Sequence, residues 1–464
     1  MDIVVIGAGI SGLASAHSLL KRFPSANLQV LEASGHCGGI ISTLYEDGCI
    51  VEEGPDSFLS TKPWAVQLCN DLNLGGQIIQ TNESNRKALV ASSGEILPLP
   101  EGFFLLAPTK IWPFIDSKVL SLSGKLSAAC EIFREKNVRV REETIKQFVT
   151  RRFGQELFDR IAQPMVGGIY TGDPDKLSAQ ATLPQFVEME RKYGSVIKGL
   201  MRERGKLTAD SGARYSAFVS LRNGMQELVD SLVRSIGSER IITNCPVSRL
   251  EKSGSTWSVQ TAEGKTIRAD SVVLAVPAPA LAKLLSGIDD ELSTELKTVE
   301  YSSCAVLNLL FDESDITKPI NGFGFVVPEI ERKSLLACSF SSNKFVGRVP
   351  AGKVLMRAFM GGALHPDVFE LSDGDLVRQT LTDLNAYLGI TTYPQRVWIK
   401  RWGKSMPQYH IGHVDLVERI KSRFANLDGL VWAGSALQGV GIPDCVRSGI
   451  EAAQAVSAST LVYS

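Results

Sequence analysis

The sequence predicts an α/β protein in which one parallel sheet is assembled from separated stretches of the chain. Residues 3–31 have the pattern strand, glycine turn, helix, strand. Helical periodicity dominates residues 100–205, and a short strand with a second glycine turn and helix follows at residues 430–453. We therefore expect a discontinuous Rossmann-like domain, a mixed-sheet domain and a helical insertion.

The first glycine turn has the features of a dinucleotide site. Gly7 permits a tight turn, Gly9 leaves bare backbone for a pyrophosphate, and Gly12 lets the helix lie close to the strand. Glu32, 20 positions after Gly12, stands where a carboxylate can accept both hydroxyls of an adenosine ribose. A glycine turn alone would also fit an ordinary loop. Together with the strands, the helix and the spaced acid, it predicts dinucleotide binding.

A second glycine pair favours FAD among the dinucleotides. Gly38 and Gly39 follow the second strand, and residues 52–57 read Glu-Glu-Gly-Pro-Asp-Ser. A nicotinamide enzyme does not need this extra loop, whereas an FAD site uses it to pass backbone along the ribityl chain and the flavin edge. No lysine or arginine stands beside this glycine pair, where His36 and Ile40 are found, so we expect backbone N–H groups and the helix dipole to bind the pyrophosphate.

The C-terminal glycine turn predicts a second contact with the flavin. Gly439 and Gly441 enter a helix, and Pro443 suits the first turn of that helix. A helix N-terminus directed at the flavin pyrimidine edge would stabilise the negative charge that develops when the ring is reduced. The alternative is a capped surface helix.

Composition limits the partners and the compartment. The 464 residues are 44% hydrophobic and 21% charged with a net charge of −1, so we expect no nucleic-acid partner. The eight cysteines form no CxxC and no metal-like pattern with the five histidines, so we expect a cytoplasmic protein without a metal site. The first strand begins at once and no apolar run reaches about 18 residues, so we expect neither a signal peptide nor a membrane span.

One apolar stretch is a candidate for peripheral membrane contact. It runs from Phe103 to Ile115 and is interrupted by prolines and by Lys110. It is either a buried loop and helix start or a face that enters the inner surface of the cell membrane. Both interpretations stay open.

The succession of patterns predicts three domains. Short strands surround the helical stretch, and residues 241–247 are expected to form one strand, whereas residues 373–388 form a helix. The predicted limits are residues 1–66, 224–285 and 425–464 for the FAD-binding domain, 67–99, 206–223 and 286–424 for the substrate-binding domain, and 100–205 for the helical insertion.

Motifs along the whole chain resemble those of the bacterial oxygen-dependent protoporphyrinogen IX and coproporphyrinogen III oxidases. They stand at residues 53–59, 108–111, 122–125, 168–173, 175–178, 406–413 and 439–445. This family belongs to the FAD-dependent amine oxidase superfamily, so the resemblance implies a glutathione-reductase-like FAD domain. It also implies three two-electron oxidations of a porphyrinogen, in which oxygen reoxidises the flavin and hydrogen peroxide is released. No catalytic acid or base is implied, because the flavin takes hydride from a meso carbon and the pocket holds the macrocycle.

The resemblance also assigns the site residues. Gly168 and Ile169 would line the pocket beside the reactive carbon, and Val326 and Phe359 would pack against pyrrole rings. The alternatives are a helix C-cap for the glycine pair at 167–168 and a core residue for Phe359. The expected cofactor contacts are Gly7, Gly9, Ile10, Ser11, Gly12, Glu32, Ala33, Gly38, Gly39, Gly54, Pro55, Asp56, Ser57, Val247, Ala275, Trp402, Gly434, Val440, Gly441, Ile442 and Pro443.

Asp56 is the position where the chain departs from the plant and animal members. Those members hold an arginine there that contacts a substrate propionate, whereas a carboxylate would repel it. Either the propionates face elsewhere or another cation, such as Arg86, Lys110 or Arg357, binds them.

Several alternatives remain open at this stage. Protoporphyrinogen IX is preferred over coproporphyrinogen III, although no motif distinguishes vinyl from propionate groups. An amine or carotenoid oxidoreductase, or a non-catalytic flavin- or porphyrin-binding scaffold that docks to a membrane or a haem-pathway chelatase, would share the fold. His410 and His413 are either hydrogen-bonded structural residues or active groups. The oligomeric state is not predicted.

Overall fold

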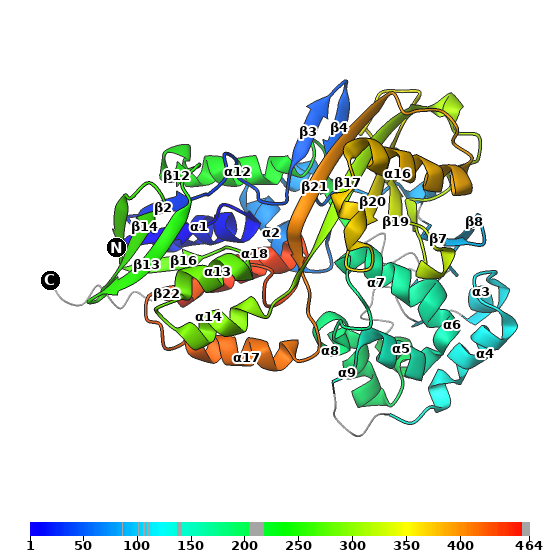
Figure 1. Cartoon of the computed structure of the whole chain (residues 1–464), viewed down its shortest axis with the longest axis horizontal. Helices are drawn as coiled ribbons and strands as arrows, with labels where there is room; N and C mark the ends of the chain where they lie inside the picture. The colour runs from blue at the N-terminus through cyan, green and yellow to red at the C-terminus, as the bar shows by residue number, and fades with distance from the viewer. Residues whose placement is uncertain are drawn as a thin grey trace.

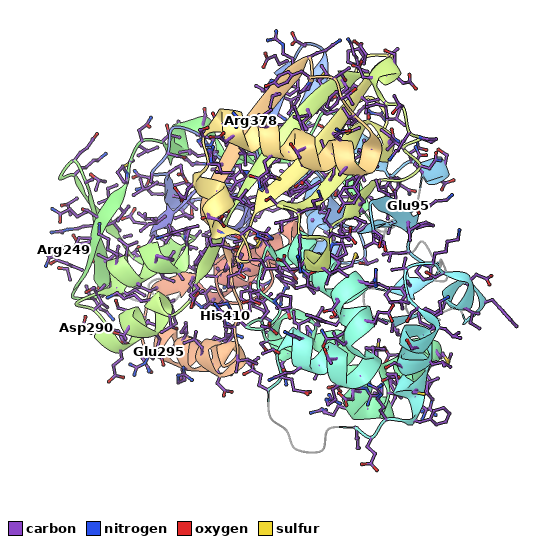
Figure 2. The ribbon with its side chains drawn as sticks, turned by 45° about the vertical axis from the view of Figure 1, so that its right-hand side comes forward. Glu95, Arg249, Asp290, Glu295, Arg378 and His410 are labelled. Carbon is purple, nitrogen blue, oxygen red and sulfur yellow. The ribbon has the colours of Figure 1, made fainter. Side chains whose placement is uncertain are left out.

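The computed structural model describes residues 1–85, 87–100, 102–104, 107–108, 111–136, 142–203 and 218–456. Three parts are visible in Figure 1: a parallel sheet with its helices near the N-terminus, a large mixed sheet, and a group of helices below that sheet. Charged side chains such as Arg249, Asp290 and Arg378 point outward (Figure 2), and both signs occur among them, in line with 49 basic and 50 acidic residues in the chain.

The first sheet is parallel and has the strand order β12, β2, β1, β16, β22. Ile3 in β1 lies opposite both Leu28 and Ser271. The bounds are β1 Asp2–Ile6, β2 Asn27–Leu31, β12 Ile241–Ile242, β16 Ser271–Leu274 and β22 Leu430–Trp432. The beginning, middle and end of the chain therefore share one sheet, which confirms the α/β fold. The limits of the three domains remain a prediction.

Both faces of this sheet are covered, because alternate residues of β1 enter two different cores. On one face, α18 lies so close to α1 that a side chain at Gly449 would collide with the carbonyl of Ser11. The helices on this face are α1 Ile10–Arg22, α2 Pro63–Asp71, α12 Gln226–Ile236 and α18 Ile442–Ala455. The other face carries β13 Val247–Ser253, β14 Thr256–Thr261, β15 Thr266–Ala269, α13 Ala278–Leu285, α14 Asp290–Lys297 and α17 His413–Phe424.

The single strand expected over residues 241–247 is wrong, because β12 and β13 belong to different sheets. The chain turns at Asn244, which has a positive φ of 53°. The amide groups of Asn244 and Cys245 donate to the carbonyls of Ser34 and Glu32, at 2.8 Å each. These bonds tie the turn to the end of β2, so the next strand starts in a new direction.

The second sheet has seven strands in the order β21, β17, β20, β19, β18, β7, β8 and is antiparallel except for the β18–β7 pair. Helix α16 Asp373–Leu388 has the predicted bounds and packs on the apolar face of the sheet. The strands are β7 Leu89–Ser92, β8 Glu95–Pro98, β17 Tyr301–Asp312, β18 Gly324–Val326, β19 Leu335–Phe340, β20 Lys353–Gly361 and β21 Arg396–Pro407. The opposite face holds polar side chains that contact residues 52–56 of the nucleotide domain.

Small elements join the two sheets. They are the hairpin β3 Thr43–Glu46 and β4 Cys49–Glu52, the three-stranded sheet of β5 Phe58–Leu59, β6 Ile78–Gln80 and β11 Phe218–Leu221, and the short helix α15 Ser341–Lys344. The pair β9 Phe103–Phe104 and β10 Ala107–Pro108 packs in the helical part instead.

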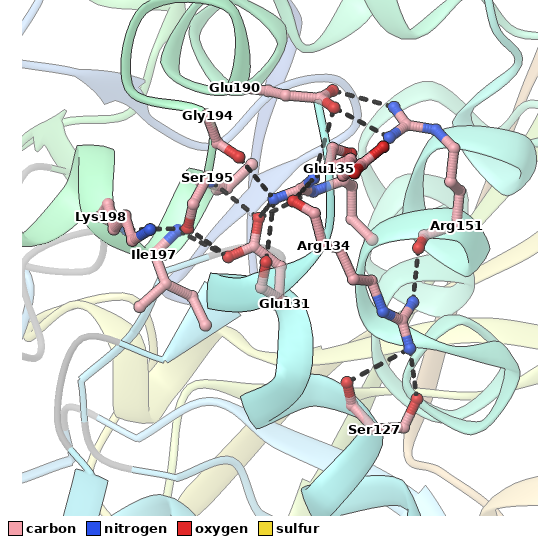
Figure 3. A network of polar contacts seen from close by, with 12 residues as sticks. Ser127, Glu131, Arg134, Glu135, Arg151, Glu190, Gly194, Ser195, Ile197 and Lys198 are labelled. Carbon is pink, nitrogen blue, oxygen red and sulfur yellow. Dashed lines mark hydrogen bonds and ion pairs between the residues drawn. The ribbon is translucent and has the colours of Figure 1, made fainter. Parts of the chain in front are cut away.

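The helical part is held together by a buried ion network (Figure 3). Arg152 and Glu131 are both fully buried, and Arg152 Nε donates to Glu131 Oε1 at 2.8 Å. Arg151 of α5 donates to Glu143 and to Glu190 of α9 with two hydrogen bonds each. Glu131 of the 3₁₀ turn also accepts from Val196 N in α10, so three helices and this turn are joined. The helices are α3 Ile111–Asp116, α4 Leu122–Ala129, α5 Ile145–Phe153, α6 Gln155–Leu157, α7 Gln163–Tyr170, α8 Ala179–Thr182, α9 Pro184–Tyr193 and α10 Val196–Glu203, with a 3₁₀ turn at Cys130–Phe133 and a π-helical turn at Phe158–Ala162.

Candidate FAD and substrate site

The first glycine turn needs its glycines for close packing. Gly7 has a positive φ of 102°, and a side chain there would collide with the carbonyl of Ala275 in the loop after β16. A side chain at Gly12 would collide with the carbonyl of Gly7. Beside Gly9, by contrast, the space for a Cβ is open, and α1 starts there without a side-chain cap. Ile10 and Ser11 form the buried first turn. Bare backbone and a helix N-terminus are thus available for an anion.

The second glycine turn packs directly on the first. Gly38 N donates to Ala8 O at 2.8 Å, and a Cβ on Gly39 would lie 3.3 Å from Gly9 Cα. Glu32 is fixed at the end of β2, because its Oε2 accepts from Ala8 N at 2.7 Å and its Oε1 accepts from Ser34 N at 2.8 Å. The two turns and the carboxylate therefore form one continuous surface.

The remaining predicted contacts of the nucleotide end lie nearby on the same elements. Ala33 follows Glu32 and is exposed, and Val247 is half-buried at the start of β13, whose preceding turn is tied to residues 32–34. His36 and Ile40 are both exposed. Their roles toward the cofactor remain predictions.

The C-terminal glycine turn supplies a second helix N-terminus at this edge. Helix α18 begins after Gly441 without a side-chain cap, and Pro443 stands in its first turn. Val440 and Ile442 flank Gly441, and open space adjoins Gly434 at the end of β22. Because α1 and α18 pack side by side, their N-termini face one region.

One cation near this turn was not predicted. Lys62 lies 2.5 Å from Asp444 in the first turn of α18. It precedes α2 and has no sequence motif around it, so only the fold brings it to this helix end.

Residues 52–56 are clamped against the polar face of the mixed sheet. Trp402 Nε1 donates to Glu53 O at 2.7 Å, and Asn308 Nδ2 donates to Glu52 O at 3.1 Å. Arg357 donates to the carbonyl of Gly54. Asn308 was missed in the sequence, because it stands 256 positions away in a strand that otherwise looks like core. Three strands thus hold the segment that contains the predicted flavin contacts Gly54, Pro55, Asp56 and Ser57.

Asp56 does not carry an uncompensated negative charge. Lys344 Nζ lies 2.9 and 2.8 Å from its two carboxylate oxygens and 3.0 Å from Ser57 Oγ, and Arg357 lies 3.7 Å away. Burial alone would raise the pKa of Asp56, but these two cations outweigh it and lower that pKa well below its usual range. Two cations therefore compensate this acid, and one of them, Arg357, is among the cations considered from the sequence, although its contact with a substrate carboxylate stays a prediction.

Arg357 has hydrogen-bonding capacity to spare. All three N–H groups of Lys344 are used by Asp56 and Ser57, whereas Arg357 Nε is buried and meets no acceptor among the described residues. One carboxylate faces two cations, so the cluster of Asp56, Lys344 and Arg357 keeps a positive charge. Of the other cations considered, Arg86 and Lys110 lie outside the described residues.

Three predicted substrate residues lie close together on this face. Val326 and Phe359 both pair with Ala337, which places them in one row across β18, β19 and β20. A Cβ on Gly168 would lie 3.4 Å from Val326 Cγ1. Phe359 is half-buried, and the Arg357 guanidinium lies 4.8 Å from its ring, so Phe359 is not enclosed in the hydrophobic core. Ile169 follows Gly168 and is half-buried.

Neither glycine of the 167–168 pair caps a helix. Both lie inside α7, whose C-cap is Thr171 with a left-handed φ of 46°. Thr171 adopts this conformation because its carbonyl accepts from Ala363 N at 2.8 Å and its hydroxyl meets Ser302 Oγ at 2.7 Å. The alternative of a glycine C-cap is therefore wrong, and the exposed Gly168 backbone needs another explanation.

The two histidines have structural contacts. His413 Nε2 lies 2.8 Å from Leu437 O, and its ring stacks on Tyr409 at 4.2 Å. His410 Nδ1 lies 3.8 Å from Glu300. Burial lowers the pKa of both histidines. Within the described part of the chain, no group of three or more His, Cys, Asp or Glu is arranged to hold a metal ion.

Comparison with known proteins identifies the family. The model of flavin containing amine oxidoreductases matches residues 10–457. The coproporphyrinogen III oxidase of Bacillus subtilis (strain 168) is 34% identical over 96% of both chains. Protoporphyrinogen oxidase 1 of Arabidopsis thaliana chloroplasts is 28% identical over 97% of this chain and 87% of that protein. A crystal structure from Exiguobacterium sp. 255-15, provisionally named protoporphyrinogen oxidase, has a TM-score of 0.86 and 30% identity over 98% of each chain.

These findings confirm the resemblance to the porphyrinogen oxidases, the α/β fold, the oxidoreductase class and the cofactor, which is FAD. The glycine turns and the two uncapped helix N-termini fit such a cofactor. The chain therefore belongs to the flavin containing amine oxidoreductase family.

Proposed function

We propose that the chain is an oxygen-using porphyrinogen oxidase of haem biosynthesis, which removes six electrons from its substrate and releases hydrogen peroxide. The observation that carries this proposal is the row of Val326 and Phe359 with the exposed Gly168 backbone against it. A flat apolar macrocycle fits such a surface, because it can lie on backbone and on an aromatic edge without meeting a bulky side chain.

Bound FAD would supply the two-electron chemistry, and the protein residues would hold the substrate. Gly168, Ile169, Val326 and Phe359 carry no titratable group. Their role is to exclude water and to bring a meso carbon within about 3–3.5 Å of the reacting atom of the cofactor. Residues 52–57 and 434–443 would hold the flavin between the two sheets.

For the substrate we propose coproporphyrinogen III first and protoporphyrinogen IX second, which reverses the order expected from the sequence. The relative with 34% identity is named after the former and the relative with 28% identity after the latter. The surplus positive charge of Asp56, Lys344 and Arg357 supports the same order, because coproporphyrinogen has two more carboxylates. We propose Arg357 as the cation that favours them.

A competition assay tests this proposal. The two porphyrinogens are supplied in one pot at equal concentration, and both product porphyrins and peroxide are measured over time. We expect coproporphyrin III to form faster and peroxide to appear with it. Faster formation of protoporphyrin IX would reverse the order, and turnover of neither substrate would contradict the function.

Peripheral membrane contact is a further part of the proposal. Within the apolar stretch predicted for this contact, Phe103 stacks on the buried Phe114, whereas Trp112 and Ile115 are 77% and 47% exposed. Residues 105, 106, 109 and 110 of the stretch lie outside the described residues. The apolar surface continues with exposed side chains of α4 and the 3₁₀ turn, which are Leu122, Leu126 and Phe133. No helix among the described residues is long and apolar enough to cross a membrane. Docking to a haem-pathway chelatase remains a prediction.

Liposome sedimentation tests the membrane contact. We expect the protein to bind vesicles and the variant Trp112→Ser/Leu126→Ser to lose this binding, since apolar side chains drive insertion at the interface. The control Val346→Ser/Tyr393→Ser changes two exposed apolar side chains far from α3 and α4 and should bind normally. Failure of the wild-type protein to sediment at any ionic strength would contradict the contact.

A further inference from the structure

A short segment between β21 and α17 contacts both the substrate helix and the loop beside the predicted flavin clamp. It comprises residues 408–413, and we call it the brace. Gln408, Tyr409 and His413 are 4%, 2% and 5% exposed. Three polar side chains buried in six residues need partners, because an unpaired buried polar group is costly.

Two of these side chains bind the loop that follows β22. Tyr409 donates its hydroxyl to Ser435 O at 2.5 Å. His413 Nε2 donates to Leu437 O at 2.8 Å, which fixes its tautomer because a carbonyl can only accept. The two rings stack, so they fix each other as well as the loop. This loop lies between Gly434 and the turn that enters α18, both predicted flavin contacts.

The third side chain holds helix α7. Gln408 Nε2 donates to Tyr170 O, the last residue of α7, at 3.0 Å, and to Ser302 Oγ at 3.0 Å. The backbone of the brace contacts a different helix, because Ser178 N at the N-cap of α8 donates to Tyr409 O at 2.8 Å. The brace therefore binds the helix that carries Gly168 and the loop next to Gly434 through adjacent residues.

We propose that the brace sets the distance between the flavin and the substrate, with Tyr409 as its main positioning residue. It rests on the proposed function, because the distance matters only if a substrate lies on Gly168. Tyr409 touches neither flavin nor substrate in this account, and it acts through the carbonyl of Ser435. A tyrosine bond to a backbone carbonyl is suited to this role, since the ring is rigid and the hydroxyl has a single hydrogen to donate.

The variant Tyr409→Phe tests the proposal, because it removes the hydroxyl and keeps the ring stacked on His413. We expect kcat to fall on the order of tenfold with KM for the porphyrinogen nearly unchanged, since a shift well below 1 Å alters the reaction geometry more than binding. The absorption spectrum of the bound FAD should also shift, because the loop that borders it moves.

Tyr387→Phe is the matched control. Tyr387 is also 2% exposed, and its hydroxyl lies 3.3 Å from Glu331 Oε2, but it stands in α16 on the far face of the mixed sheet. We expect it to lose stability without a change in kcat or in the flavin spectrum. The proposal is overturned if Tyr409→Phe behaves like Tyr387→Phe.

A second variant keeps the test decisive. If Tyr409→Phe does not fold, His413→Phe removes the other bond to the loop and retains an aromatic ring. This variant should lower kcat and shift the flavin spectrum in the same way. A folded His413→Phe protein without these changes overturns the proposal. If wild-type protein oxidises no porphyrinogen, the proposed function fails, while the spectral comparison of the variants still decides for or against the brace.

Discussion

Two clusters of charged residues in the molecule both pair an arginine with a carboxylate. They differ in whether all hydrogen-bond donors of the arginine have partners. In the helical part, Glu131 accepts from Arg152, from Ser195 Oγ at 2.5 Å and from Val196 N at 2.8 Å. Arg152 also donates to the backbone carbonyls of Glu131 and Gly194. At the candidate site, Arg357 leaves Nε unpaired beside Asp56.

The difference indicates two roles. A buried ion pair whose hydrogen bonds are all made holds its helices in one arrangement, and its loss leaves a charge without a partner. A cluster with a spare donor and a surplus cation gains little stability from that cation, but it can attract an anionic ligand. We therefore expect the same type of substitution to have different consequences at the two places.

Arg152→Met should have the largest effect on stability. It leaves the Glu131 carboxylate fully buried without its cation, which costs about 3–5 kcal/mol of unfolding free energy. Chemical denaturation followed by circular dichroism measures this loss. Folded protein should still retain FAD, since the network lies far from the glycine turns. A loss below about 1 kcal/mol would contradict a structural role for the pair.

Gly168→Ala should lower the rate without lowering stability. The new methyl group would meet Val326 at an ordinary contact distance of 3.4 Å, so the fold can accept it, but it displaces a macrocycle that lies on this backbone. A misplacement near 1 Å costs on the order of a hundredfold in kcat/KM. Steady-state kinetics with each porphyrinogen checks this value.

Gly167→Ala is the control for this substitution. Gly167 lies inside α7, and its Cβ would have only Gln163 Nε2 within reach, at 3.8 Å. We expect near-normal turnover and a gain of about 0.5–1 kcal/mol in stability, because alanine is the better helix former. If Gly168→Ala keeps normal turnover, the macrocycle does not lie on this backbone.

Arg357→Met makes the same substitution as Arg152→Met, but at the candidate substrate site. We expect KM for coproporphyrinogen III to rise about tenfold, equivalent to about 1.4 kcal/mol, with a smaller rise for the substrate with fewer carboxylates. The loss of stability should be smaller than for Arg152→Met, because Lys344 still neutralises Asp56 when the contacts of Arg357 with Asp56 and the Gly54 carbonyl are lost. If KM for each porphyrinogen is the same in the variant as in the wild type, Arg357 does not recognise the substrate carboxylates.

Asp56→Asn should change stability in a way that depends on pH. The pKa of Asp56 is lowered in the folded state, so its charge contributes stability above the unfolded pKa of about 4. This contribution is lost as pH falls through the folded value. We therefore expect the wild type to be more stable than the variant at pH 7 and the difference to shrink below about pH 4. Urea titrations at several pH values test this; a constant difference would contradict the low pKa.

The sequence predicts local elements and fails where distant segments meet. The glycine turns, the acid at 32 and helix α16 follow from spacing within a few residues. Lys344 binds Asp56 from 288 positions away, and Asn308 meets Glu52 from 256, so no local pattern indicates them. The C-cap of α7 is Thr171 and not a glycine, because tertiary hydrogen bonds favour the left-handed backbone of Thr171.

The most direct measurement is anaerobic mixing of the FAD-loaded protein with coproporphyrinogen III in a rapid-scanning spectrophotometer. We predict that the oxidised flavin absorbance is lost in a single turnover, and that admission of oxygen restores it with formation of coproporphyrin III and peroxide. The same loss should be slower on the order of a hundredfold in Gly168→Ala and nearly unchanged in Gly167→Ala. A flavin that stays oxidised with both porphyrinogens would contradict the assigned function.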